Sequence, residues 1–362
     1  MNHQTTIPTK PLARISSLDS LRGLAIVMVA AIHCSQSYDS SFGITKLLAP
    51  YGSLGVQLFF IISGFTMLLT FGDNFNLRIV GAFYIRRIAR IVPLFWLAIL
   101  AYLLIDGLGA RFWAPNGIHW SEIISTFVFL FGFMPHAINA IVPGGWSIAI
   151  EMQFYCIFPL FAYLFIRRGF NTAIPYLMIV LIHGLGLVAS RWYFADAIRP
   201  LFEPNEYSLI ASFLYFWLPN QLLCFGFGFL LYEQIEKNTF NVTGTILLVA
   251  SSLVTSLGLS IFFLFLLSYF VLSNKISINI FRQIGLVSYA MYLMQFAVIQ
   301  LVSLLWIKST GHLPSFELGF IAVVLISYLV SRYIIAPAIE KPAIHFGKVL
   351  ASRLKPQTSL TR

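Results

Sequence analysis

The sequence predicts an all-α fold: a polytopic bundle of about ten transmembrane helices with one short re-entrant or interfacial helix. Of its 362 residues, 59% are hydrophobic and only 10% are charged, whereas charged residues make up about a quarter of a typical soluble domain. Apolar runs of membrane-spanning length recur along the chain. The 35 Phe, 16 Tyr and 7 Trp residues suit lipid-facing helices with aromatic side chains at the interface. These features exclude a soluble domain as the main body.

Ten apolar runs are long enough to cross a hydrocarbon layer. They lie near residues 18–38, 48–71, 88–106, 145–166, 174–190, 208–232, 242–257, 258–273, 284–306 and 316–337. An eleventh run, 123–134, is shorter and is followed by Pro135 and His136. By length this run fits a span, a re-entrant segment or an interfacial helix.

The positions of the basic residues favour a non-spanning element at 121–136. Cytoplasmic loops carry an excess of Lys and Arg. With a cytoplasmic N-terminus and ten spans, Arg167 and Arg168 fall inside, together with the basic residues before the third span. An eleventh crossing would place both outside. We therefore expect both termini in the cytoplasm, although Arg191 and Arg199 then lie in an outer loop, against the trend.

The net charge of +10 comes from short basic stretches between apolar runs, which is typical of membrane topology rather than of nucleic-acid binding. Three isolated cysteines, Cys34, Cys156 and Cys224, show neither metal-ligand spacing nor an even count that would suggest disulfides. No soluble domain is visible. We expect one integral membrane domain over 1–345 and a short basic cytoplasmic tail over 346–362.

Arg22 and His33 in the first span are predicted to share one helix face. They are eleven residues apart, which gives roughly 16.5 Å of rise and three turns plus about 20°. Arg22 then lies near the cytoplasmic headgroups, and His33 lies about halfway across the apolar layer. An ionisable group at that depth usually faces a protein interior or a water-filled cavity and marks a functional path. The alternative is a packing histidine bonded to a neighbouring helix.

The fourth span carries Glu151, Gln153 and Tyr155 within an apolar run. Burying such groups without partners is costly. Glu151 and Tyr155 are four residues apart and share a face, while Trp146, which follows two glycines, suits an interfacial anchor. A polar network that only joins helices is the alternative to a functional site.

Arg86, Arg87 and Arg90 form a basic cluster at the predicted start of the third span. Their spacing stacks the guanidinium groups on one side of a helix. Such a cluster suits phosphates, either of lipid headgroups or of a phosphorylated soluble donor. In the second span, Ser63 beside Gly64 either permits close helix approach or leaves room for a ligand.

In order along the chain, these segments resemble the acyltransferase-3 family, typified by O-antigen and exopolysaccharide O-acetyltransferases. The segments that carry the resemblance are Arg22 with His33, 59–65, 86–93, 146–159, 288–293 and 340–342. The family often has two consecutive acidic residues where this chain has Glu151 and Met152, and often a His where this chain has Gln295. The roles of those missing groups are not carried over.

The resemblance implies a membrane-bound O-acyltransferase of the bacterial inner membrane. It implies transfer of an acyl group, in the family most often acetyl, from cytoplasmic acyl-CoA to a hydroxyl of a cell-surface glycan or its lipid-linked precursor. Acyl-CoA would be a donor substrate rather than a bound cofactor, with membrane lipids as the other partners and no metal or nucleic acid. Since no appended hydrolase-like domain is visible, a single transfer step is expected.

Acyl transfer needs a base for the acceptor hydroxyl, a site for the donor phosphates and stabilisation of the oxyanion. His33 is the expected general base, because imidazole titrates near physiological pH, and Glu151 is expected to orient it or to hold the acceptor. The expected donor-binding residues are Arg22, Arg86, Arg87, Arg90 and Ser63. The expected supporting residues are Asp19, as a partner for one of the arginines, and Trp146, Gln153 and Tyr155.

A glycolipid or polysaccharide-intermediate transporter or flippase is the alternative function, in which His33 and Glu151 would relay protons. No inverted repeat is evident in the sequence, which weakens this alternative. A non-catalytic membrane scaffold is a third possibility, disfavoured by the number of buried polar groups.

Overall fold

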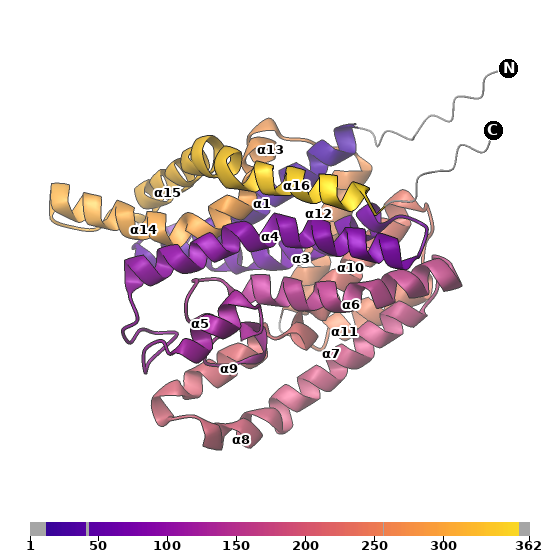
Figure 1. The fold of residues 1–362 in the computed structure, drawn as a ribbon, viewed down its shortest axis with the longest axis horizontal. Coiled ribbons are helices and arrows are strands. Elements are labelled where there is room, and N and C mark those ends of the chain that lie inside the picture. The colour runs from indigo at the N-terminus through magenta and orange to yellow at the C-terminus, as the bar shows by residue number, and fades with distance from the viewer. Residues whose placement is uncertain (1–11, 41–42, 256, 355–362) are drawn as a thin grey trace.

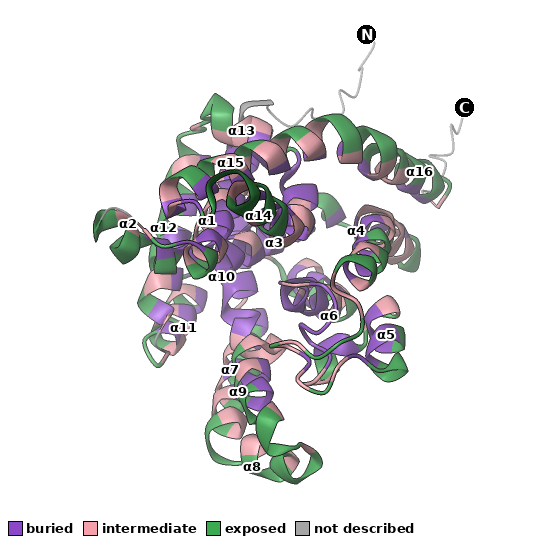
Figure 2. Ribbon diagram, turned by 90° about the vertical axis from the view of Figure 1, so that its left-hand side faces the viewer, coloured by how far each residue is buried: buried purple, intermediate pink, exposed green. Residues whose placement is uncertain are grey.

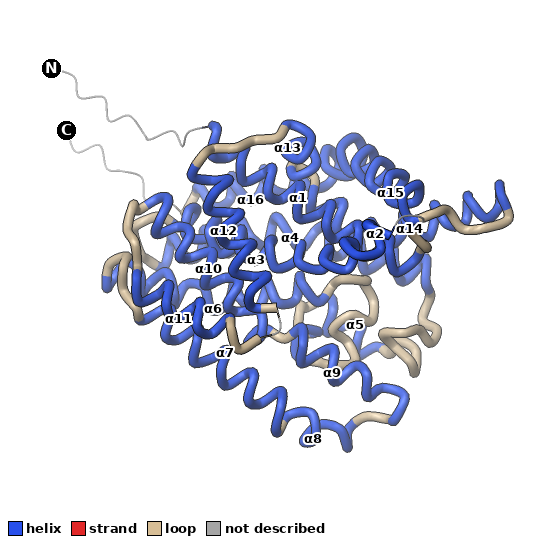
Figure 3. Tube along the Cα trace, turned by 180° about the vertical axis from the view of Figure 1, so that it is seen from behind, coloured by secondary structure: helices blue, strands red, loops and turns tan. Residues whose placement is uncertain are grey.

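The computed structural model describes residues 12–40, 43–255 and 257–354. Within these ranges the chain forms helices joined by loops and no strand (Figure 3), apart from one isolated bridge between Arg111 and Ala114. The predicted all-α class is confirmed.

The first half of the chain supplies the helices that surround the later site. They are α1 (Leu12–Ser37), α2 (Gly43–Leu48), the 3₁₀ turn η1 (Ala49–Ser53), α3 (Leu54–Phe71), α4 (Leu77–Asp106), α5 (Trp120–Phe127), the 3₁₀ turn η2 (Phe131–Phe133) and α6 (Trp146–Arg168).

The second half begins with α7 (Ile174–Trp192), α8 (Phe194–Ile198), the 3₁₀ turns η3 (Arg199–Leu201) and η4 (Pro204–Glu206), α9 (Tyr207–Phe216), α10 (Leu218–Glu236) and α11 (Val242–Ser252). It continues with α12 (Gly258–Ser273), α13 (Asn279–Gly285), α14 (Ser288–Thr310), α15 (Phe316–Val330), the π-helix η5 (Ser331–Glu340) and α16 (Lys341–Ser352).

Among the residues that the structure describes, eight helical stretches are long and apolar enough to cross a membrane. They are Ser16–Ser37, Gly43–Phe71, Leu77–Asp106, Trp146–Arg168, Ile174–Trp192, Pro204–Glu236, Ser288–Thr310 and Phe316–Ser352. These correspond to eight of the ten predicted spans. The other two, near 242–257 and 258–273, form α11 and α12, which have 11 and 16 residues and extend roughly 16 and 24 Å. Both are shorter than a hydrocarbon layer of about 30 Å.

The segment predicted not to cross, 121–136, contains α5 and η2. Helix α5 has eight residues and extends roughly 12 Å. It ends at Phe127, and Phe129 then takes a positive φ of 62°, a left-handed conformation that no α-helix continues. The described backbone therefore agrees with a short non-spanning element at this position.

Helix α4 begins eleven residues earlier than the apolar run near 88–106 predicts. Asn76 caps it, because its side-chain oxygen accepts the backbone N–H of Ile79 at 2.8 Å. The expectation that Arg86, Arg87 and Arg90 stand at a helix start is therefore wrong. They lie in the third and fourth turns, because the polar cap, and not the hydrophobic run, determines where the helix begins.

The bundle is centred on the crossing of α3 and α10. Every residue of α10 from Gln221 to Glu233 is buried, and α10 lies in the interior (Figure 2). Gly64 of α3 and Gly228 of α10 allow this contact. A Cβ at Gly64 would lie 2.5 Å from the Phe225 carbonyl oxygen, and one at Gly228 would lie 2.3 Å from that of Ile61. Small residues allow such close approach of two helix backbones.

The start of α1 and the end of α16 lie at the same side of the molecule (Figure 1). Helix α16 packs along α4, where Gly347 meets the Ala89 side chain. The predicted basic tail at 346–362 thus begins within α16. Its last eight residues, 355–362, lie outside the described residues.

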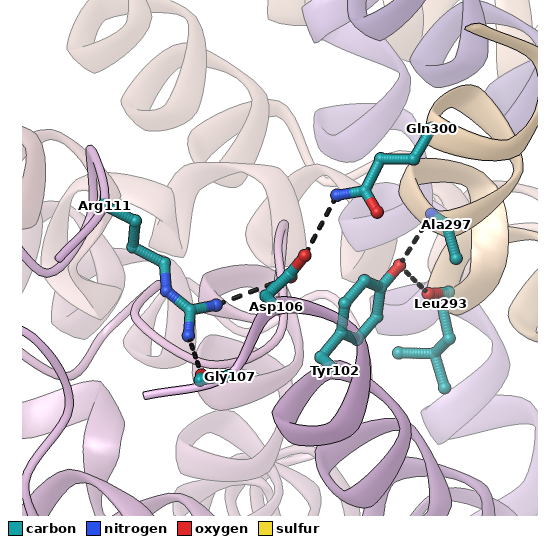
Figure 4. Close-up of polar contacts among 7 residues, drawn as sticks. All are labelled: Tyr102, Asp106, Gly107, Arg111, Leu293, Ala297 and Gln300. Carbon is teal, nitrogen blue, oxygen red and sulfur yellow. Dashed lines mark hydrogen bonds and ion pairs between the residues drawn. The ribbon is translucent and has the colours of Figure 1, made fainter. Parts of the chain in front are cut away.

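Tyr102 ties α4 to α14 (Figure 4). Its hydroxyl donates to the Leu293 carbonyl at 2.9 Å and accepts the Ala297 N–H at 3.2 Å. Asp106, one turn later, accepts a hydrogen bond from the Gln300 amide at 3.1 Å. These contacts fix α14 relative to α4, which positions the α14 side chains described next.

Candidate active site

A cavity with about 710 Å³ of empty volume lies between α1, α3, α4, α6 and α14. Its polar or aromatic lining comprises Arg22, Phe59, Phe60, Ser63, Thr66, Arg87, Arg90, Ser147, Glu151, Tyr155, Ser288, Tyr289 and Tyr292. Five helices that are distant in sequence thus bring six of the predicted site residues to one place. These six are Arg22, Ser63, Arg87, Arg90, Glu151 and Tyr155.

Three guanidinium groups face this cavity. Arg22 pairs with Asp19 at 2.9 Å, as the sequence led us to expect for Asp19. Arg87 donates to the Thr70 hydroxyl at 3.1 Å, and its guanidinium carbon lies 5.3 Å from the centre of the Tyr155 ring. For Arg90 we find no hydrogen bond or ion pair to any residue that the structure describes.

Arg22 interacts electrostatically with both Arg87 and Arg90. Like charges repel more strongly in a low-dielectric interior than in water. An anionic ligand in the cavity would relieve this repulsion, and guanidinium groups bind phosphate and carboxylate through charge-assisted, often paired hydrogen bonds.

Glu151 lines the same cavity as the arginines, and one of its carboxylate oxygens is held by two hydrogen bonds. Its Oε1 accepts the Ser63 hydroxyl at 2.6 Å and the Tyr155 hydroxyl at 2.5 Å. Its Oε2 has no hydrogen-bond partner among the described residues. Two hydroxyl donors therefore hold the carboxylate and leave one oxygen available to a bound molecule.

His33 does not line this cavity. Its ring centre lies 4.3 Å from that of Phe296 on α14, and its Nδ1 lies 3.2 Å from the Gln36 amide oxygen. Because an amide oxygen can only accept, Nδ1 carries the proton and Nε2 keeps a free lone pair. Phe296 is one turn beyond Tyr292, which does line the cavity, so His33 lies beyond that end of it. No contact between His33 and Glu151 is found in the described structure.

Asp19, which pairs with Arg22, and three other predicted residues also lie outside the cavity lining. Arg86, although adjacent to Arg87, is absent from it. Gln153 lies against η2, where a Cβ on Gly132 would meet its amide nitrogen at 2.7 Å. Trp146 is only 9% exposed and stacks on Phe216 at 4.2 Å, so it is an interior contact and not the interfacial anchor that its flanking glycines suggested.

Five polar lining residues were not assigned a role from the sequence: Thr66, Ser147, Ser288, Tyr289 and Tyr292. Tyr292 donates to the Gly144 carbonyl at 2.7 Å and accepts from Ser147 at 2.7 Å, and Tyr289 donates to the Ile91 carbonyl at 2.8 Å. The sequence could have pointed to three of these residues. The segment 288–293, which includes Ser288 and both tyrosines, carries part of the family resemblance.

Glu340 at the end of η5 is a further charged residue beside the arginines. It is 8% exposed, its Oε2 has no hydrogen-bond partner, and it interacts electrostatically with Arg90. It belongs to the resembling segment 340–342. Its carboxylate partly offsets the positive charge behind the cavity.

Comparison with known proteins gives a family match over most of the chain. The model of the acyltransferase-3 family, described as an acyltransferase domain, matches residues 15–263. The peptidoglycan O-acetyltransferase OatA of Listeria monocytogenes is 28% identical over 196 residues, covering 49% of this chain and 28% of that protein. The acyltransferase MdmB of Streptomyces mycarofaciens is 30% identical over 165 residues, covering 43% of this chain and 41% of that protein.

The chain thus spans less than half the length of either relative. No solved structure matches the chain at a significant level. The family match includes α1, α3, α4 and α6, which carry all six predicted residues that meet in the cavity. Since the family match covers well over half of the chain, this chain belongs to the acyltransferase-3 family.

Proposed function

We propose that this protein transfers an acyl group, acetyl in the first instance, from cytoplasmic acyl-CoA to a hydroxyl of a cell-surface glycan or its lipid-linked precursor. The bacterial inner membrane, with both chain termini in the cytoplasm, is the proposed location. The observation that carries the proposal is one cavity that combines three arginines with a carboxylate held by two hydroxyl groups.

The arginines account for the donor. Acyl-CoA presents phosphates, and guanidinium groups bind phosphate through paired, charge-assisted hydrogen bonds. Arg90 is the best placed, since no described residue occupies its guanidinium. Arg22 and Arg87 keep one partner each, Asp19 and Thr70, and would add charge. Arg86 does not line the cavity, so the proposal assigns it no direct contact with the donor.

The transfer replaces the carbon–sulfur bond of the thioester with a carbon–oxygen bond to the acceptor. The acceptor hydroxyl oxygen attacks the thioester carbonyl carbon, the carbon–sulfur bond breaks, and the sulfur leaves with a proton. Glu151 Oε2 is proposed to accept a hydrogen bond from the acceptor hydroxyl, while Ser63 and Tyr155 hold its other oxygen. The hydroxyl groups of Tyr289 and Tyr292 line the same space and would exclude water around the reacting groups.

His33 remains the proposed general base. Its Nε2 lone pair is free, because Gln36 fixes the proton on Nδ1. The Phe296 ring that packs on the imidazole would have to turn aside for a hydroxyl to reach Nε2. The proposed division of roles therefore places donor binding at the arginine end of α1 and proton removal three turns further along it.

The glycan acceptor is supported by the name of one relative, which acetylates peptidoglycan. The identity of the sugar and of its carrier is not part of the proposal.

Membranes containing the protein, incubated with acetyl-CoA labelled in the acetyl group, test the whole proposal. We expect label to enter the glycan fraction and to be released by mild alkali as acetate, as an O-ester requires. Matched membranes with Glu151→Gln should incorporate much less label. Label that stays in acetyl-CoA, at equal protein level, would contradict the enzyme assignment and favour a transporter.

A further inference from the structure

Helices α7 and α11 pack against each other and begin at the same level. Asn241, which caps α11, donates from its side-chain amide to the Thr172 carbonyl at 3.1 Å, just before α7 begins. One turn into both helices, Gly244 lies against the Tyr176 ring, where its Cβ would lie 2.7 Å from the ring atom Cδ2. The two helices therefore start side by side.

The two helices also run in the same direction but differ in length. Further along each of them, Leu248 of α11 and Ile179 of α7 both approach Gly226 of α10. Helix α7 has 19 residues and α11 has 11, so they extend roughly 28 and 16 Å. Helix α7 therefore continues for roughly 12 Å beyond the end of α11.

A second cavity occupies the space beyond the end of α11. It has about 1710 Å³ of empty volume and lies between α3, α7, α10, α11 and α12. Its lining on α7 runs from Val180 to Trp192, a rise of roughly 18 Å. Helix α11 contributes only Ala250 and Ser251, near its end. Since one leaflet of the hydrocarbon layer is about 15 Å thick, the cavity has about the depth of a leaflet.

The accessible wall of this second cavity is apolar. Gln57, His183 and Gln221 belong to the lining but are only 3%, 1% and 4% exposed, so they offer it almost no surface. Val188 and Val254 also line it and are 50% and 68% exposed. Water needs several polar partners to occupy a cavity, so hydrocarbon is the filling that suits this wall.

Arg191 stands at one end of the cavity, in the last turn of α7. It is exposed, and we find no hydrogen bond or ion pair for it in the part of the chain that the structure describes. The nearest acidic residue along the chain, Asp196, pairs with Arg199 at 3.6 Å. Trp192 lines the same end and is 70% exposed, as is typical of a membrane–water interface. A positive charge without a described partner thus lies at the level of lipid headgroups.

A guanidinium group at this level favours a lipid phosphate. It donates two parallel hydrogen bonds to phosphate oxygens, and it keeps its charge at physiological pH. A zwitterionic head would bring its own cation to the same place, so a lipid whose only charge is the phosphate fits better. A bound phosphate would also balance a charge that the positive-inside trend does not predict for this loop.

We propose that the second cavity binds an anionic phospholipid, with one acyl chain in the space beyond the end of α11 and the phosphate on Arg191. Helix α8, which follows α7, lies away from the chain ends (Figure 1), so the lipid comes from the leaflet on that side. Its chain supplies the packing that a longer α11 would provide. Helix α3 separates it from the arginine cavity, since Val56 lines that cavity and Gln57 lines this one. The lipid therefore takes no direct part in acyl transfer.

Photolabelling of the full-length protein in phosphatidylcholine nanodiscs tests this site. The probes are a phosphatidylglycerol and a phosphatidylcholine that carry the same diazirine at the end of one acyl chain, each added as a minor component. We expect the phosphatidylglycerol probe to label peptides from the end of α11 and the second half of α7 about fivefold more, as the attraction between one arginine and an anionic lipid implies. Equal labelling of these peptides by the two probes would overturn the site.

Two arginine variants show whether the preference comes from the proposed contact. Arg191→Gln should label equally with both probes. Arg199→Gln is the matched control, because Arg199 is also exposed, pairs with Asp196 and does not line the cavity. It should keep the preference for phosphatidylglycerol. A preference that persists in Arg191→Gln, or that is lost equally in both variants, would contradict a phosphate on Arg191.

A third variant tests the position of the acyl chain. Gly184 lines the cavity, and no atom lies within 4 Å of a Cβ built on it, so Gly184→Phe fills the space without a clash. We expect it to lower labelling of the α11 peptides by the phosphatidylglycerol probe about fivefold or more, to the level of the phosphatidylcholine probe. Labelling at the wild-type level in Gly184→Phe would mean that the chain lies outside the cavity and would refute the proposal.

Discussion

Ser63 and Gly64 are adjacent on α3 but face different neighbours. Successive helical residues point about 100° apart. Ser63 faces the cavity and donates to Glu151, while Gly64 faces α10 and lets the Phe225 carbonyl approach. The sequence left two interpretations open for this pair, close helix packing and room for a ligand. The structure assigns one of them to each residue.

His33→Ala is expected to lower acyl transfer by about 10²- to 10⁴-fold, the usual contribution of a positioned general base. The measurement is acetyl incorporation into glycan per amount of inserted protein. Gln36→Ala should cause a smaller loss, since it only frees the Nδ1 proton that Gln36 now fixes. Wild-type transfer by His33→Ala would show that another group, with Glu151 the nearest candidate, takes the proton.

Arg90→Ala is expected to raise the donor KM by about 10- to 100-fold, because a charge-assisted hydrogen bond contributes roughly 1.5–3 kcal/mol. Arg86→Ala is the matched control, one turn away on the same helix but outside the cavity lining. We expect its donor KM to change by less than about threefold, because a charge that does not contact the donor directly contributes only about 0–1 kcal/mol. If the two variants shift the donor KM equally, the cavity is not where the phosphates bind.

The positions of whole helices depend on single polar contacts that do not appear in a hydropathy profile. Asn76 starts α4 eleven residues before its apolar run, and this brings Arg87 and Arg90 onto a rigid helix facing α6 and α14. Tyr102 then fixes α14 against α4. Both contacts involve a single polar side chain, and neither changes the average hydrophobicity of its helix.

Gly64→Ala is expected to destabilise the protein by about 1–3 kcal/mol, because its Cβ would meet a backbone carbonyl that cannot move aside. Thermal unfolding in detergent, followed by loss of monodisperse protein, measures the effect. Gly184→Ala is the control, since no atom lies within 4 Å of its Cβ, and it should be neutral or slightly stabilising. Equal melting temperatures would mean that α3 and α10 do not approach as closely as described.

For the whole molecule, α1 begins and α16 ends at the same side, which agrees with an even number of crossings. In the proposed topology, which follows the positive-inside rule, that side is the cytoplasmic one. Among the described residues, eight helical stretches are long and apolar enough to cross a membrane. Helices α11 and α12 are apolar but shorter. Either both of these cross or neither does, if the ends are to remain on one side.

Two matched aspartate-to-cysteine variants, in a Cys156→Ser background, test this topology. Asp73 and Asp196 have exposed side chains, 63% and 78%. We expect Asp73→Cys to react with a membrane-impermeant maleimide only after the membrane is permeabilised, and Asp196→Cys to react in intact spheroplasts. The reverse pattern would invert the orientation and place the arginine cavity on the wrong side for a cytoplasmic donor.

Much of the site could be predicted from the sequence, because charged residues in apolar runs are conspicuous and their spacing gives a helix face. Arg22, Ser63, Arg87, Arg90, Glu151 and Tyr155 were identified in this way and meet in one cavity. Periodicity gives the direction of a side chain relative to its own helix only. It therefore did not separate Arg86 from Arg87, and it did not place Phe296 over His33.

The sequence by itself determined that this chain is a bundle of membrane helices and which polar side chains its apolar runs carry, because hydrophobic length and helical spacing are local properties. Only the tertiary structure decided which of those side chains share a cavity, and that one oxygen of Glu151 has no hydrogen-bond partner among the described residues. These depend on contacts between helices far apart in the chain, and such contacts are decided by how the helices pack against one another.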